Sequence, residues 1–285
     1  MLGTVGDLVE DIVVRLGGSV NVASDTRAVV LRRRGGSAAN VAASAVRAGT
    51  AARFIGQVGD DAHGGVLIAA LRACGVEVVV RRGGRTGTVV VLVDQLGERT
   101  MLSDRGDSTG LDRPDPAWLD GLRVLHVPLY SLVIGHLADT AATLIESAHQ
   151  RGIIVSIDAS SAAVINDYGV DRVAQMLTRL RPEVLLCNEL EAEVLGPAVE
   201  PSRIGATVTV IKQGAGPALV LQPGHPTVSV AAAPIDLVRD TTGAGDAFAA
   251  GFLCAFIAGK SALVSAMSGH RAAAAQIAVA SAQTG

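Results

Sequence analysis

Short apolar runs alternate with longer amphipathic stretches over the second half of the chain. The apolar runs predict strands at 124–127, 153–157, 184–187 and 207–211, and the stretches between them predict helices at 134–151, 171–181 and 189–195. Strands that alternate with helices pair in parallel and are covered by helices on both faces. The pattern therefore predicts an α/β fold with a mostly parallel central sheet, completed by a hairpin at 219–221 and 227–230 and a helix at 261–280.

The first half of the chain carries a different pattern. Strands are expected at 1–6 and 51–58, and helices at 41–49, after Ser37 as N-cap, and at 62–74. Short β runs at 13–16, 28–31, 76–80, 88–93 and 99–102 are separated by turns. Because no helix intervenes between 76 and 102, we expect an antiparallel β patch, assembled from about 12–35 and 77–106 within one domain that spans 1–285.

The composition limits the classes of protein to which this chain can belong. Hydrophobic residues make up 49% of the chain and charged residues 18%, enough to bury a large core. A net charge of −3 suggests neither nucleic acid nor a membrane surface as partner. The sequence has no apolar run of membrane-spanning length and no signal-peptide pattern, and its three cysteines lack the spacing of a disulfide framework or a zinc site. The expected location is the cytoplasm.

The stretch Asp240–Asp246 combines an anion cradle with an acid. We expect it to follow a strand at 235–238 and to open a long apolar helix near Ala244. Its two glycines allow a tight turn whose free N–H groups can bind a phosphate or an oxyanion. Asp246 would repel that anion unless it accepts a proton from an attacking hydroxyl. A capped helix with Thr242 as N-cap explains the same residues equally well.

Two other strand ends carry polar groups. Asn188 and Glu191 have nearly the spacing of a capping box, which the residues alone favour, or they reach Mg²⁺ through its waters. Lys212 precedes Gly214 and Gly216, where a nucleotide can lie against the backbone and the ammonium can face a phosphate. A simple turn between strands explains that segment equally well.

Asp11 and Asn40 suit the recognition of several hydroxyl groups. Ligands of open α/β sheets bind where loops leave the carboxyl ends of strands, and these two residues are expected on such loops together with the pair Gly35-Gly36. Arg105 follows the last β run of the patch, where a guanidinium can reach a hydroxyl or a carboxylate. The sequence thus predicts a site that collects polar side chains from distant segments.

These motifs resemble the ribokinase-like carbohydrate kinases, the PfkB family. Asp240-Thr-Thr-Gly-Ala-Gly-Asp246 is similar to the second signature of the family, and Gly35-Gly-Ser-Ala-Ala-Asn40 followed by Ile55–Asp61 looks like the first. The resemblance extends over nearly the whole chain. It implies a three-layer, Rossmann-like α/β/α domain in which the β patch is a lid that closes over the sugar and often pairs with a second subunit.

The resemblance implies a role for each matching residue. Asp246 would be the general base, and the backbone of Gly243, Ala244 and Gly245 would form the anion hole. Sugar contacts would come from Asp11, Gly35, Gly36 and Asn40; Arg105 is added as a helper from its position after the last β run of the patch. ATP would contact Asn188, Lys212, Gly214, Gly216, Thr241 and Gly243, and Mg²⁺ would be served by Asn188 and Glu191.

The implied activity is transfer of the γ-phosphate of ATP to a hydroxyl of a small carbohydrate, by a homodimer formed through the lid. A nucleoside kinase of the same family is disfavoured because such enzymes hold a base between aromatic rings, and aromatic residues are only 2% here. A non-catalytic sugar- or nucleotide-binding member is disfavoured by the intact Asp246 and glycines. A dinucleotide oxidoreductase lacks its glycine fingerprint.

Three departures from the family pattern limit what the resemblance implies. The nucleotide loop Gly214–Pro217 looks one residue short. The chain stops at Gly285, near the point where many members carry further residues that help to bind a monovalent cation. A role for K⁺ is therefore left open. Pro128 and Leu129 stand where ribokinase itself has an acid that contacts substrate, which argues against ribose.

Overall fold

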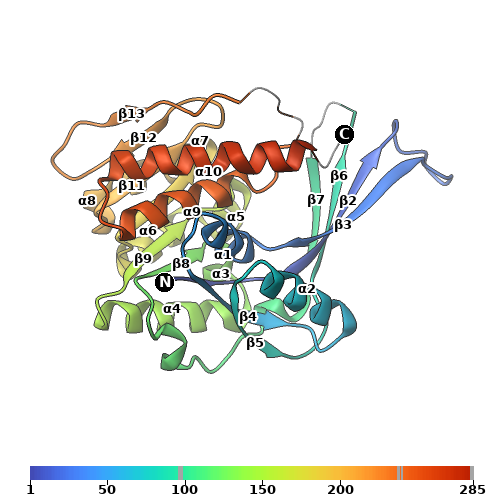
Figure 1. Ribbon diagram of the computed structural model, residues 1–285, viewed down its shortest axis with the longest axis horizontal. Helices are drawn as coiled ribbons and strands as arrows, with labels where there is room; N and C mark the ends of the chain where they lie inside the picture. The colour runs from blue at the N-terminus through green and yellow to red at the C-terminus, as the bar shows by residue number, and fades with distance from the viewer. Residues whose placement is uncertain (96–98, 236–237, 239, 283–285) are drawn as a thin grey trace.

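The computed structural model describes residues 1–95, 99–235, 238 and 240–282. Its main body contains a nine-stranded sheet in the order β13-β12-β11-β10-β9-β8-β1-β4-β5 (Figure 1). The strands are β1 (Leu2–Val5), β4 (Ala52–Val58), β5 (Glu77–Arg82), β8 (Val124–Pro128), β9 (Ile154–Asp158), β10 (Val184–Asn188), β11 (Val208–Lys212), β12 (Ala218–Leu221) and β13 (Val228–Val230). Pairing is parallel from β5 to β11 and antiparallel beyond, which confirms the mostly parallel sheet.

Helices cover both faces of this sheet, as the three-layer α/β/α prediction requires. One face packs against α1 (Ser37–Arg47), α2 (Ala62–Ala73), α9 (Ala244–Ile257) and α10 (Ala262–Ala282). The other packs against α3 (Tyr130–Val133), α4 (Gly135–Gln150), α5 (Ala162–Tyr168), α6 (Val170–Leu180), α7 (Glu189–Leu195) and α8 (Pro201–Ile204). Successive residues of β10 alternate between the two cores: Leu186 belongs to the first, whereas Leu185 and Cys187 belong to the second.

A second sheet projects from one end of the main body (Figure 1). It has the order β3-β2-β6-β7 and consists of β2 (Val9–Leu16), β3 (Ala28–Gly35), β6 (Thr88–Val93) and β7 (Arg99–Asp104); we call these four strands the lid. Val9, Val13, Val89 and Val91 form a small apolar core on its inner face. Of the predicted patch, the segments at 13–16, 28–31, 88–93 and 99–102 therefore join as expected.

Two predictions about the patch are wrong. Residues 77–82 form β5, which pairs in parallel with β4 in the main sheet, because α2 supplies the crossover that parallel pairing needs. The lid is also not purely antiparallel, since β2 pairs with β6 in parallel. These two strands are separated along the chain by β3, α1, β4, α2 and β5, so the chain can return in the same direction.

Local details differ at two helix starts. Ser37 is the first residue of α1 rather than its N-cap, which is Gly36, and the N-cap of α9 is Gly243 rather than Thr242. Ile235 and Val238 lie outside any strand, and residues 236 and 237 of the strand predicted there lie outside the described residues. Within the described part of the chain, no helix is both long and apolar enough to cross a membrane.

Candidate active site

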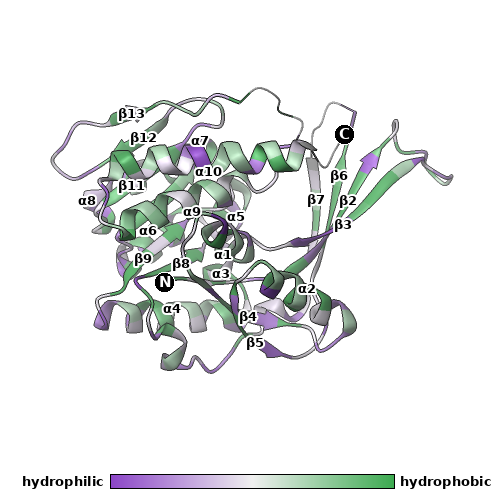
Figure 2. Cartoon of the chain, in the orientation of Figure 1, coloured by the Kyte–Doolittle hydropathy of each residue, from purple (hydrophilic) through white to green (hydrophobic). Residues whose placement is uncertain are grey.

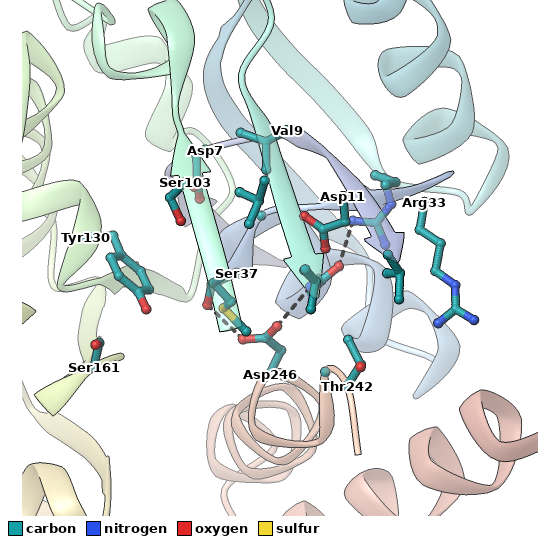
Figure 3. A pocket seen from close by; sticks show the side chains of 18 of the residues that line it. Asp7, Val9, Asp11, Arg33, Ser37, Ser103, Tyr130, Ser161, Thr242 and Asp246 are labelled. Carbon is teal, nitrogen blue, oxygen red and sulfur yellow. Dashed lines mark hydrogen bonds between the residues drawn. The ribbon is translucent and has the colours of Figure 1, made fainter. Parts of the chain in front are cut away.

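A cavity of about 1350 Å³ lies between the lid and the main body (Figure 3). Its walls include residues of the lid, of α1 and of the turn before α9. Seven of the residues predicted from the sequence line it: Asp11, Gly36, Asn40, Arg105, Thr241, Gly243 and Asp246. Segments that are more than 200 residues apart in the chain thus meet at one site, for example Ser37 and Asp246 with a separation of 209.

Asp246 lies in the first turn of α9, and its carboxylate points towards α1 (Figure 3). Ser37 Oγ donates a hydrogen bond to its Oδ1 at 2.7 Å, and Asn40 Nδ2 donates to its Oδ2 at 3.0 Å. Burial raises the pKa of Asp246 to about 6, against the lowering effect of these two hydrogen bonds. A carboxylate of this pKa is ionised at neutral pH and is close to the optimum for a general base.

The glycine turn before Asp246 is held from two sides. Gly243 has φ 74°, a left-handed conformation that favours glycine. Asp240 accepts a hydrogen bond from the N–H of Thr242 at 2.9 Å, and Gln276 of α10 donates to the carbonyl of Thr242 at 3.1 Å. The Ala244 N–H donates to Thr241 O at 3.1 Å, so it is already engaged within the turn.

Gly35 and Gly36 are needed because the backbone passes close to two acids. A Cβ at Gly35 would lie 2.1 Å from Asp11 Oδ1, and one at Gly36, whose φ is 98°, would lie 2.2 Å from the carbonyl oxygen of Asp7. Gly35 therefore contributes space rather than a contact to the cavity. Burial, and then the charge of Asp7, raises the pKa of Asp11 to about 6, although nearby arginines oppose the shift.

Arg105 reaches from the end of the lid to the main body. Its guanidinium forms an ion pair with Asp7 and lies 4.3 Å from the centre of the Tyr130 ring. Asp7 is 4% exposed and lines the cavity, yet the sequence analysis did not select it. It lies two residues after the end of β1, so the criterion that selected Asp11, a polar residue after a strand, could have identified it. Asp11 itself, which was expected on a loop, lies within β2.

Of the residues predicted to bind the nucleotide, Thr241 and Gly243 line this cavity. The others lie outside its lining, at the ends of β10 and β11 and in the loop that follows: Asn188, Lys212, Gly214 and Gly216. Lys212 Nζ donates to Asp158 Oδ2 at 2.6 Å, and it would lie 3.8 Å from a Cβ at Gly245, so the ammonium is beside the glycine turn. Burial alone would lower the pKa of Lys212, but the carboxylates of Asp158 and Glu191 outweigh it and raise that pKa. Asp158, at the end of β9, was not predicted.

The loop after β11 forms a tight turn. Gly214 has φ 56°, and a Cβ there would meet no atom within 4 Å. The N–H of Gly216 donates to the carbonyl of Gln213 at 2.7 Å. The surface over Gly214 is therefore open to a ligand, in the position expected for the nucleotide loop.

The capping box of α7 is confirmed. The Asn188 N–H donates to Glu191 Oε2 at 2.7 Å, the Glu191 N–H donates to Asn188 Oδ1 at 2.9 Å, and Asn188 Nδ2 donates to Glu191 Oε1 at 2.7 Å. Glu191 is 2% exposed, and burial together with Asp158 raises its pKa to about 7. Among the described residues, no group of three or more His, Cys, Asp or Glu is placed to hold a metal.

Comparison with known proteins gives the family. The model of the pfkB family of carbohydrate kinases matches residues 7–285. This chain belongs to the pfkB family. As a carbohydrate kinase, it is a phosphotransferase with an alcohol group as acceptor.

Curated relatives of this pfkB-family kinase include sugar kinases of different specificity. The chain is 33% identical over 234 residues to an ATP-dependent ribose-1-phosphate kinase of Halopiger xanaduensis. The match covers 78% of this chain and 73% of the relative. It is 30% identical over 261 residues to a fructokinase of Klebsiella pneumoniae, and the match covers 84% of this chain and 82% of the relative.

Solved structures support the same fold. Adenosine kinase from Sinorhizobium meliloti has a TM-score of 0.86 at 23% identity, covering 100% of this chain and 99% of that one. A putative ribokinase II from E. coli has a TM-score of 0.83 at 19% identity, covering 97% and 92%. At these identities the likeness identifies a ribokinase-like fold and leaves the acceptor open.

Proposed function

We propose that this kinase transfers the γ-phosphate of ATP to a hydroxyl of a small carbohydrate, with Asp246 as the general base. The observation that carries this proposal is the carboxylate of Asp246, which two donors hold in the cavity beside the glycine turn. Phosphoryl transfer requires mainly alignment of the attacking hydroxyl and neutralisation of the transferred group. Asp246 can orient the hydroxyl and accept its proton, and the turn can bind the phosphoryl oxygens.

In this proposal the anion hole is the turn Gly243-Ala244-Gly245 together with the ammonium of Lys212, and its donors are the N–H groups of Gly243 and Gly245, because that of Ala244 is engaged with Thr241. The proximity of Lys212 to Gly245 supports this role, because a fixed cation beside backbone N–H groups stabilises developing negative charge. Asn188, Gly214, Gly216 and Thr241 would contact the nucleotide. Mg²⁺ would arrive with ATP and neutralise its phosphates. Glu191 and Asn188, with Asp158 beside them, would face the waters bound to the Mg²⁺ ion.

The acceptor would lie between Asp246 and the inner face of the lid, held by Asp11, Gly36 and Asn40. Tyr130 is the only aromatic residue among the described residues that line the cavity, and Arg105 already lies over its ring. A pair of rings that could enclose a nucleobase is therefore missing from that lining, which supports a sugar over a nucleoside.

A phosphorylated sugar is a second candidate acceptor. The observation that favours it is the presence of several guanidinium groups in the cavity lining, which also contains aspartates: Arg15, Arg33, Arg34, Arg47 and Arg105. Guanidinium groups are suited to phosphate recognition, and one relative is named a ribose-1-phosphate kinase. Arg105 is paired with Asp7, and Arg15 and Arg33 are both within salt-bridge distance of Asp240, so a substrate phosphate would share these cations with carboxylates already in place.

The test is a thermal-shift screen of neutral sugars, sugar phosphates, sugar acids and nucleosides with a non-hydrolysable ATP analogue, followed by ATP consumption with each compound that binds. A substrate at 100 times its Kd stabilises the protein by about 2.7 kcal/mol. Consumption of ATP with a nucleoside and with no sugar would contradict the proposal, and so would binding without consumption.

We also propose that two copies of this chain pair through the outer face of the lid. Asp11 and Val13 line the cavity, so the alternating residues Ile12 and Val14 face outward. On the two edge strands of the lid, β3 and β7, Val30 is 56% exposed and Leu102 is 55% exposed, and Figure 2 shows hydrophobic colouring along the projecting part of β3. An exposed apolar sheet favours pairing. Light scattering at micromolar concentration is expected to give twice the monomer mass, and Leu102→Lys is expected to reduce it.

A further inference from the structure

Three consecutive arginines at the end of β3 have three different partners. Arg32 pairs with Glu10 at 2.9 Å and is exposed, whereas Arg33 pairs with Asp240 at 3.4 Å. Arg34 is partly buried, and its Nη1 donates a hydrogen bond to Asn40 Oδ1 at 3.0 Å. Within the described part of the chain, no carboxylate lies within salt-bridge distance of the Arg34 guanidinium. A partly buried cation that contacts an amide rather than an acid requires an explanation.

The contact with Arg34 decides which way the Asn40 amide points. A guanidinium can only donate hydrogen bonds, so the amide oxygen of Asn40 must face Arg34. The amide nitrogen must then face Asp246, to whose Oδ2 it donates at 3.0 Å. The reverse orientation would place the nitrogen against the guanidinium and the oxygen against a carboxylate, and both contacts would be repulsive.

We propose that Arg34 is a positioning residue, which acts through the Asn40 amide to hold the carboxylate of Asp246 in the orientation that faces the acceptor hydroxyl. This inference rests on the proposed role of Asp246 as general base. It adds a residue that need not touch the substrate and that the family motif Gly35–Asn40 does not include. The resulting chain of contacts runs from the lid through α1 to α9, so it connects the lid with the reacting carboxylate.

The charges around this chain of contacts also support a role for Arg34 at Asp246. The positive charge of Arg34 interacts with Asp246 and with Asp11, while Arg47 is a like charge and Cys74 a further neighbour. Asp246 is also influenced by Asp158, which raises its pKa, and by Lys212, which lowers it. Loss of the Arg34 charge should therefore raise the pKa of Asp246, since one favourable cation is removed and the remaining groups are unchanged.

The experiment compares Arg34→Met and Arg34→Lys with Arg32→Gln, a matched control on the same strand whose partner is outside the site. Arg34→Met is expected to lower kcat by about 10-fold or more, as the loss of an oriented base implies, and to shift the acid limb of kcat/KM to higher pH. Arg34→Lys should restore part of the activity because it keeps a donor and a charge. Arg32→Gln should match the wild type in both measurements.

A double-mutant cycle tests the route through Asn40. If Arg34 acts through the amide, Arg34→Met should cause little further loss in an Asn40→Ala background. Fully additive losses, or an acid limb that stays in place in both Arg34 variants, would overturn the proposal. Asp246→Asn is measured in the same assays. If Asp246→Asn keeps turnover, Asp246 is not the base. If Asp246→Asn is inactive and Arg34→Met is normal, only the role of Arg34 is rejected. If Arg34→Met does not fold, Arg34→Gln, which also removes the charge, replaces it: a wild-type rate and pH profile would reject the proposal, and a reduced rate with a shifted acid limb would support it.

Discussion

Lys212 Nζ lies 2.6 Å from Asp158 Oδ2, and this contact joins the ends of β11 and β9 across the end of β10. The two side chains are 15% and 11% exposed, so the ion pair is largely withdrawn from water. Because Lys212 also lies beside Gly245, the carboxylate of Asp158 holds a cation at the turn where the transferred phosphoryl group is proposed to bind.

Lys212→Met should reduce both activity and stability. Loss of one preorganised donor at a developing anion lowers kcat by about 10²–10³-fold. The unpaired buried carboxylate of Asp158 should lower the free energy of unfolding by about 3–5 kcal/mol. The double variant Lys212→Met/Asp158→Asn separates the effects, since it should regain stability but not turnover. Recovery of turnover in the double variant would show that Lys212 is only structural.

Asp246→Asn keeps size and helix position but cannot accept a proton. Its kcat should fall by about 10²–10⁴-fold, with little change in the KM for either substrate. Burial penalises the charged form of Asp246 at pH 8, whereas an amide can accept only one of the hydrogen bonds from Ser37 and Asn40. Because these two effects oppose each other, the variant should stay folded with a Tm close to that of the wild type. Single-turnover phosphorylation and melting curves measure both effects. Turnover near the wild-type rate in a folded variant would exclude Asp246 as the base.

The pH profile reports on the same carboxylate. The folded-state pKa of Asp246 is about 6, above its ordinary value of 3.8, so the base becomes protonated as pH falls through about 6. The value of kcat/KM should be constant above that pH and should decline by about tenfold per unit below it. Asp11 also titrates near 6, and Asp11→Asn identifies its share of the decline. An acid limb that begins near pH 4 would contradict this assignment.

Asp11→Ala should affect the acceptor more than the nucleotide. Asp11 lines the cavity beside Gly35, so its loss should raise the KM for the sugar by about 10-fold or more, as expected when a charged hydrogen bond is removed, and leave the KM for ATP near the wild-type value. The control is Glu10→Gln, because Glu10 is the preceding residue of β2 and lies on its opposite face. Equal increases in both KM values would place Asp11 outside the acceptor site.

Glu191→Gln distinguishes the capping box from a role with magnesium. The amide can accept only one of the two hydrogen bonds from Asn188, so the box alone predicts a loss of about 1 kcal/mol in stability with normal turnover. A role with Mg²⁺ predicts reduced activity that excess Mg²⁺ partly restores. The raised pKa of Glu191 means that its neutral form stabilises the fold at low pH and that this stabilisation disappears as pH rises through about 7. The Tm deficit of the variant should therefore shrink between pH 5 and 8.

The sequence determined the features that depend on local order. Alternating apolar runs and helices predicted the parallel sheet, and the spacing of Asn188 and Glu191 predicted their capping box, because both follow from interactions between residues a few positions apart. The glycine turn before Asp246 was predicted for the same reason, since the glycines alone permit its left-handed φ.

The tertiary structure decided which distant residues meet. Whether the run at 77–82 joined the lid or the main sheet depended on the crossover through α2, which the run itself does not record. Asp158 gained its importance only from Lys212, 54 positions away, and Asp246 met Asn40 across 206 positions. Such contacts depend on how whole strands and helices pack, and a pattern of period 2 or 3.6 fixes the face of a residue but not its partner.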